Sequence, residues 1–146
     1  MTGVQTCALP IFQKPFTPEA AKGIARFWVD VYDEPALIAT KLAALLGREV
    51  PRDAYDMDLL MAAGRDPSVE QIRWALTRAG VNREDALHVL KVRLDGLTWE
   101  RFLTELAGAL PEPIRERIDA AEWEALKERV HTYALKLLQT KAHAPP

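Results

Sequence analysis

The chain has 146 residues, enough for one domain, and a formal net charge of −2. Hydrophobic residues make up 49% and charged residues 27% of it, which is typical of a globular protein. No apolar run approaches the ~20 residues of a membrane-spanning helix. The small net charge does not favour nucleic acid or a membrane surface as partner. We therefore expect a cytoplasmic protein that does not contact the membrane.

The composition favours an all-α fold, because Ala, Leu, Glu and Arg are abundant and alternating β-branched residues are scarce. We predict a compact bundle of six or seven short helices with a longer C-terminal helix. Glycines recur close to once per helix and mark units that end at Gly47, Gly80 and Gly108. The alternative is therefore a short α-solenoid built of helix pairs.

Residues 1–11, MTGVQTCALPI, differ in character from the rest. They resemble the translation of a sequencing-adapter oligonucleotide, so we expect this segment to be non-native. Cys7, the only cysteine, then carries no information, and whether native chain precedes Phe12 stays open. The predicted organisation is a single helical domain over residues 12–139, followed by a flexible tail over residues 140–146.

Residues 12–16 read as a linker that contains Pro15, and Thr17-Pro18-Glu19 predicts a first helix. The apolar face of that helix consists of Ile24, Phe27, Trp28 and Val31. Further start and stop signals predict helices over residues 33–47, 53–64, 66–80, 82–96, 98–108 and 111–139.

Residues 66–110 form the centre of the predicted bundle, as three consecutive amphipathic helices. Asp66-Pro67, or Ser68 with Gln71, begins the first of them. Asn82 caps the second and Thr98 the third. Short connections of this kind make neighbouring helices fold back on each other.

Two features suggest a contact surface. Trp74 points away from the apolar face of its predicted helix, so it is either covered by a neighbouring helix or exposed at an interface. The last helix carries a heptad-like stripe. The candidate interface residues are Trp74, Val130, Tyr133 and Leu137.

Basic residues offer an alternative, nucleic-acid-binding function if one face gathers them. Residues 97–118 also have the helix–turn–helix arrangement, although the exposed turn alternates glutamate with arginine, as a solvated face does. The candidate residues are Arg73, Arg78, Arg83, Lys91, Arg93, Arg115 and Arg117.

Metal and catalytic sites are not favoured. The pairs Asp85/His88 and Glu128/His131 have the i, i+3 spacing of a helical metal site, but they lie off the predicted inward faces. The acidic run Asp53, Asp56 and Asp58 is explained by helix capping and exposure. We predict no catalytic residue, no metal site and no cofactor.

These observations lead to a small non-catalytic protein–protein interaction or assembly module, whose partner is another protein or a second copy of the chain. The alternatives are a helix-turn-helix-like nucleic-acid-binding protein and a fragment or subunit of a larger enzyme.

Overall fold

The computed structural model describes residues 11–16 and 27–140, and it is helical from Glu34 onwards. The helices are α1 (Glu34–Gly47), α2 (Pro51–Met61), α3 (Val69–Ala79), α4 (Ala86–Asp95), α5 (Trp99–Glu105), the 3₁₀ turn η1 (Ala107–Ala109), α6 (Glu112–Arg115) and α7 (Ala120–Thr140). The predicted helical bundle with a longer last helix is confirmed.

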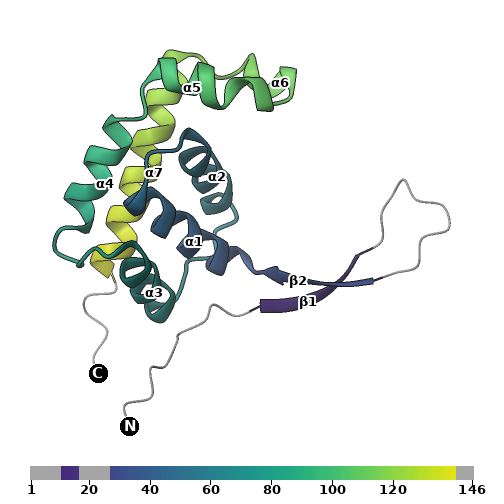
Figure 1. The fold of residues 1–146 in the computed structure, drawn as a ribbon, viewed down its shortest axis with the longest axis vertical. Coiled ribbons are helices and arrows are strands. Elements are labelled where there is room, and N and C mark those ends of the chain that lie inside the picture. The colour runs from purple at the N-terminus through teal and green to yellow at the C-terminus, as the bar shows by residue number, and fades with distance from the viewer. Residues whose placement is uncertain (1–10, 17–26, 141–146) are drawn as a thin grey trace, which may run out of the picture.

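Helix α1 lies at the centre of the bundle because it is apolar on most of its surface. A helix of this kind must be covered on several sides. It packs against α2, α3 and α4 (Figure 1). Its buried residues are Ala36, Ile38, Ala39, Leu42, Ala43, Leu45 and Leu46.

The packing is that of a bundle, not of a solenoid. In a solenoid each unit contacts only its neighbours along the chain. Here α7, the last helix, packs against α2, α4 and α5 and runs along the bundle behind α1 and α2 (Figure 1). Two members of its heptad-like stripe, Val130 and Leu137, are 0% and 1% exposed.

A two-stranded antiparallel hairpin precedes the bundle, which corrects the prediction for this region. The predicted linker is strand β1 (Ile11–Phe16), and the second half of the predicted first helix is strand β2 (Phe27–Tyr32). Ile11 pairs with Tyr32 and Phe16 with Phe27. The run FWVDVY mixes aromatic and β-branched residues, which favour strands. The predicted helix start at Thr17 lies outside the described residues.

Side-chain caps fix several helix ends as predicted. The Asp33 carboxylate accepts a hydrogen bond from the Ala36 amide at 2.9 Å. Of the two rival starts for α3, Ser68 is the cap, and it exchanges hydrogen bonds with Gln71 in a capping box. Gly80 ends α3 at φ +68°, in the left-handed region that favours glycine.

Helix α4 begins later than predicted. It starts at Ala86, because Asn82 accepts a hydrogen bond from the Asp85 amide at 2.8 Å and closes a turn of its own ahead of the helix. The predicted start at Asn82 is therefore four residues too early.

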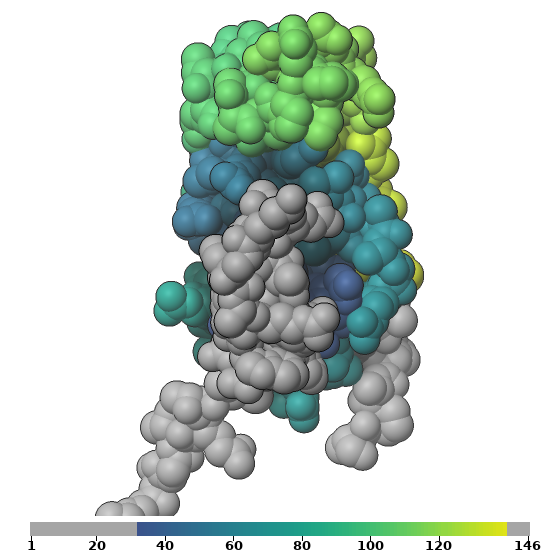
Figure 2. Space-filling model, turned by 90° about the vertical axis from the view of Figure 1, so that its right-hand side faces the viewer, coloured from purple at the N-terminus to yellow at the C-terminus, as the bar shows by residue number. Residues whose placement is uncertain are grey.

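Aromatic rings join α5 to α7 at one end of the molecule. Phe102 stacks on Trp99 at 4.8 Å between ring centroids and lies 4.9 Å from Trp123. Trp123 is fully buried, and its indole N–H donates to the Leu97 carbonyl at 2.8 Å. The segment from α5 to α6 lies above α2 at this end of the molecule and is coloured green in Figure 2. No described helix is both long and apolar enough to cross a membrane.

Candidate functional site

A cluster of five charged residues joins α1 to the first turns of α2. Asp53 accepts hydrogen bonds from Lys41 Nζ at 3.1 Å and from Arg48 Nε and Nη2 at 2.8 and 3.2 Å. Lys41 Nζ also lies 2.6 Å from Asp56 Oδ2, and Arg52 Nε lies 3.6 Å from the same oxygen. Three cations thus surround two carboxylates, and we call this group the charged cluster.

Asp53 is the centre of the cluster, because its side chain is only 2% exposed. Burial opposes the ionised form, but hydrogen bonds from Arg48 and Lys41 outweigh it and hold the pKa of the Asp53 carboxyl below its usual value. Burial likewise lowers the pKa of the Lys41 amine, yet its bonds to Asp56 and Asp53 raise it overall. Asp53 and Lys41 are therefore both ionised at neutral pH.

The sequence builds this cluster by simple helix geometry. Lys41 lies within α1, and Arg48 follows as the extended C-cap residue of that helix, so both side chains reach Asp53 at the start of α2. Pro51 occupies the first turn of α2 and places Asp53 beside the helix N-terminus, where a negative charge is favoured. The predicted role of Asp53 as an exposed capping residue is wrong, since it accepts bonds from two cations of the preceding helix and loop.

The cations of the cluster remain partly accessible. The side chains of Arg48 and Arg52 are 61% and 70% exposed, whereas that of Lys41 is 22% exposed. Asp53 occupies Nε and Nη2 of Arg48 and leaves Nη1 without a partner among the described residues. The buried Asp53 carboxylate thus holds one exposed guanidinium group, that of Arg48, in position, which suits the binding of an anion.

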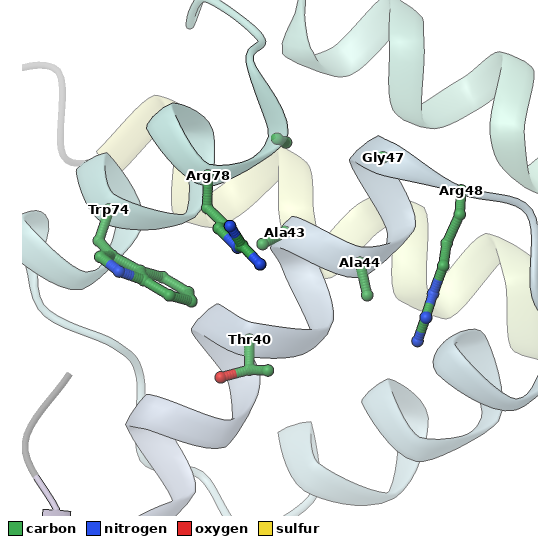
Figure 3. A pocket seen from close by; sticks show the side chains of 8 residues that line it. Thr40, Ala43, Ala44, Gly47, Arg48, Trp74 and Arg78 are labelled. Carbon is green, nitrogen blue, oxygen red and sulfur yellow. The ribbon is translucent and has the colours of Figure 1, made fainter. Parts of the chain in front are cut away.

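A groove of about 470 Å³ opens beside the cluster, between α1 and α3. Arg48 belongs to both, so the groove continues the charged cluster. Figure 3 shows Trp74 and Arg78 pointing from α3 towards α1, with Thr40 and Ala44 on the facing helix. The lining residues are Thr40, Ala43, Ala44, Gly47, Arg48, Trp74, Arg78 and Ala79.

Two arginines, one on α4 and one on α5, hold the loop that carries Arg48 through ion pairs. Glu49 follows it, and its carboxylate lies 3.1 Å from Arg93 Nη1 and 3.3 Å from Arg101 Nη1. Arg101 also donates to the Glu49 carbonyl. A Cβ added at Gly96 would come within 2.7 Å of Glu49 Oε2, so glycine leaves room for this carboxylate.

The structure separates the basic residues of the nucleic-acid hypothesis. Only Arg78 lines the groove. Arg83 donates to the Leu138 carbonyl, Lys91 pairs with Asp95, and Arg93 pairs with Glu49. Arg73 on α3, together with Arg115 and Arg117 at the α6 end, is exposed. These residues therefore form no single basic face.

The predicted interface residues have different environments. Trp74 is half-buried at the edge of the groove. Val130 and Leu137 are covered by the chain's own helices. Tyr133 is half-buried, and its hydroxyl donates to Asp66 at 2.8 Å. Burial, followed by the hydrogen bond to Asp66, raises the pKa of the Tyr133 hydroxyl.

The acid–histidine pairs belong to other contacts. Asp85 accepts a hydrogen bond from the Asn82 side-chain amide, and His88 is exposed. Among the residues that the structure describes, no three His, Cys, Asp or Glu side chains gather in a way that could hold a metal ion.

Sequence reasoning missed the charged cluster and the groove. The available signal was Lys41 within a largely apolar helix and Arg48 directly after it, followed by an i, i+3 pair of aspartates. Charges in that position need partners, because a buried helix face tolerates them only when they are paired.

Fold and site together define a helical protein in which a buried aspartate holds an exposed arginine beside a groove. The family model described as the nucleotidyl transferase AbiEii toxin of a type IV toxin–antitoxin system matches residues 7–141. The chain belongs to this family. No curated protein and no solved structure matches it.

Family membership corrects the functional prediction. The family is one of enzymatic toxins, so the prediction of a non-catalytic interaction or assembly module is wrong, and a helix-turn-helix-like protein is not what the family describes. Sequence reasoning missed this function because it found no local motif for catalysis or nucleotide binding.

Proposed function

We propose that this chain takes part in nucleotidyl transfer, and that its charged cluster binds the phosphate groups of the reaction. The observation that carries the proposal is the buried, ionised Asp53, which holds Lys41 and Arg48 in place beside the exposed Arg52. Family membership supports the reaction class, and the geometry supports the assignment of the cations.

In nucleotidyl transfer an acceptor oxygen attacks the α-phosphorus of a nucleoside triphosphate. The bond from that phosphorus to the oxygen that bridges it to the β-phosphorus breaks, pyrophosphate leaves with the bonding electrons, and the proton of the acceptor hydroxyl passes to the solvent. Negative charge builds up on the phosphate oxygens, and preorganised cations stabilise it. Arg48 Nη1 and the Arg52 guanidinium are the groups of the cluster best placed to do this, since both remain accessible.

The partner and location follow from the same proposal. A toxin–antitoxin system includes an antitoxin, so we expect a protein counterpart for this chain. The predicted cytoplasmic location fits a reaction that consumes nucleoside triphosphates. The family match begins at residue 7, inside the segment predicted to be non-native, and both that segment and the single domain over residues 12–139 stay predictions.

The experiment is a pyrophosphate-release assay with the purified chain, each of the four ribonucleoside triphosphates, and bacterial total RNA as acceptor. We expect release with at least one nucleotide, and a loss of about 100-fold in Arg48→Gln, by analogy with removal of one preorganised donor. The matched control is Arg65→Gln, since Arg65 is as exposed as Arg48 but pairs with Glu34, outside the cluster.

The control should keep full activity. Absence of pyrophosphate release with all four nucleotides would overturn the proposed reaction. Equal activity of wild type and a folded Arg48→Gln variant would overturn the role of the cluster.

A further inference from the structure

We propose that the groove between α1 and α3 holds one nucleotide unit, with its base against Trp74 and its phosphate between Arg48 and Arg78. The proposal rests on the proposed function, to which it adds the ligand class of the groove. The charged cluster contains cations and carboxylates but no aromatic ring, whereas the groove adds Trp74 and a further arginine, Arg78.

The size of the groove fits such a ligand. Its volume of about 470 Å³ lies within the range of small-molecule sites. The wall on α1 consists largely of small residues, so the backbone of that helix lies close to the ligand. A Cβ added at Gly47 would meet nothing within 4 Å, which shows that this end of the groove is open.

The charge of the groove favours an anion. Arg48 offers Nη1, and Arg78 has no hydrogen-bond or ion-pair partner among the described residues. Among the described residues, no carboxylate lines the groove. Asp53 fixes Arg48 from behind, so a phosphate bound there meets a preorganised donor.

Trp74 supplies the group that recognises a base. Its ring is half-buried and faces the groove (Figure 3). Trp123, by contrast, is fully buried in the aromatic contact between α5 and α7. Bases stack on aromatic side chains with little preference for sequence. The Thr40 hydroxyl donates to the Ala36 carbonyl, so its oxygen can still accept a hydrogen bond from a base or sugar.

These features predict which nucleotides enter. A stacked base must be unpaired, so a duplex should not bind in the groove. A free nucleoside triphosphate and the end of a single strand carry the same recognised unit, a base with its phosphate. The experiment therefore uses both.

The experiment is a calorimetric titration of the whole chain with the four ribonucleoside triphosphates, a single-stranded hexanucleotide and its duplex. We expect Trp74→Ala to weaken binding by about 5- to 150-fold, the loss of one base–aromatic stack. Arg78→Gln should weaken it by about 10-fold or more. Ala44→Leu, which fills the groove and changes no charge, should also weaken binding. The control is Arg73→Gln, on the same helix but outside the groove.

Each outcome decides the proposal. Preferred binding of the triphosphates identifies the donor nucleotide as the occupant, and preferred binding of the single strand identifies the acceptor. Wild-type binding that Trp74→Ala, Arg78→Gln and Ala44→Leu change no more than the control does would overturn the groove proposal and leave nucleotidyl transfer intact. Absence of binding for every probe would also overturn it, while pyrophosphate release tests the reaction independently.

Discussion

Replacing Asp53 by asparagine tests whether the charged cluster holds α1 and α2 together. The substitution keeps the size of the side chain and removes its charge. It deprives Arg48 of a bidentate partner and leaves Lys41 with Asp56 alone. The new amide group would also point N–H donors at two cations.

The expected loss of stability follows from how deeply each partner, Asp53 and Arg48, is buried. Breaking a buried ion pair by removing one partner costs about 3–5 kcal/mol, and an exposed pair contributes about 0–1 kcal/mol. Asp53 is 2% exposed, but the Arg48 side chain is 61% exposed and regains water when its partner is lost. We therefore expect Asp53→Asn to lower the free energy of unfolding by about 2–4 kcal/mol.

The stability that Asp53 contributes should decrease as the pH falls. The pKa of Asp53 is lower in the folded chain than in the unfolded one, so its stabilisation is present above the unfolded value of about 4. It is lost as the pH falls through the folded pKa. The difference in unfolding free energy between wild type and Asp53→Asn should therefore be largest near neutral pH and shrink in acid.

The assay is urea unfolding followed by circular dichroism, at pH 7 and at several lower values. At pH 7 the midpoint should fall by about 1 M or more, with an unchanged slope. The matched control is Asp95→Asn, because Asp95 pairs with Lys91 at an exposed site and its loss should leave the midpoint unchanged. A midpoint for Asp53→Asn equal to that of wild type would refute the reasoning.

Two further predictions concern the elements that position the site. Trp123→Phe removes the donor of the buried Leu97 carbonyl and should cost about 2–3 kcal/mol in thermal or urea unfolding, clearly more than Trp99→Phe at the half-exposed ring of the same aromatic contact. Equal losses would show that the hydrogen bond adds nothing. Ser68→Ala removes the capping box of α3, which carries Trp74 and Arg78, and should cost about 1 kcal/mol; Ser68→Asp, which restores an acceptor, should recover most of it.

The helices were predictable because their signals are local. Asp33, Ser68 and Gly80 each mark a helix end through a contact with residues a few positions away. The hairpin was missed because the pairing of Phe16 with Phe27 joins segments separated by residues that suggested a helix start. Strand pairing depends on contacts that a local pattern does not contain.

The site was predictable only in fragments. Trp74 and Arg78 were both singled out from the sequence, but for two different hypotheses. They share one face of α3, yet the groove that they line exists only where α3 lies against α1. Asp53 was read as exposed because its cationic partners belong to the preceding helix and loop. Tertiary packing, which no local signal encodes, gathers these separate residues on the face that we propose binds a nucleotide.

The most direct test of this face is nuclear magnetic resonance of the four indole N–H groups during titration with the ribonucleoside triphosphates. We predict a saturable shift of the Trp74 signal, while the signal of the buried Trp123, which is bonded to Leu97, stays in place. In Arg78→Gln the same Trp74 shift should need a higher nucleotide concentration. Saturable nucleotide binding that leaves the Trp74 signal unmoved would contradict the account.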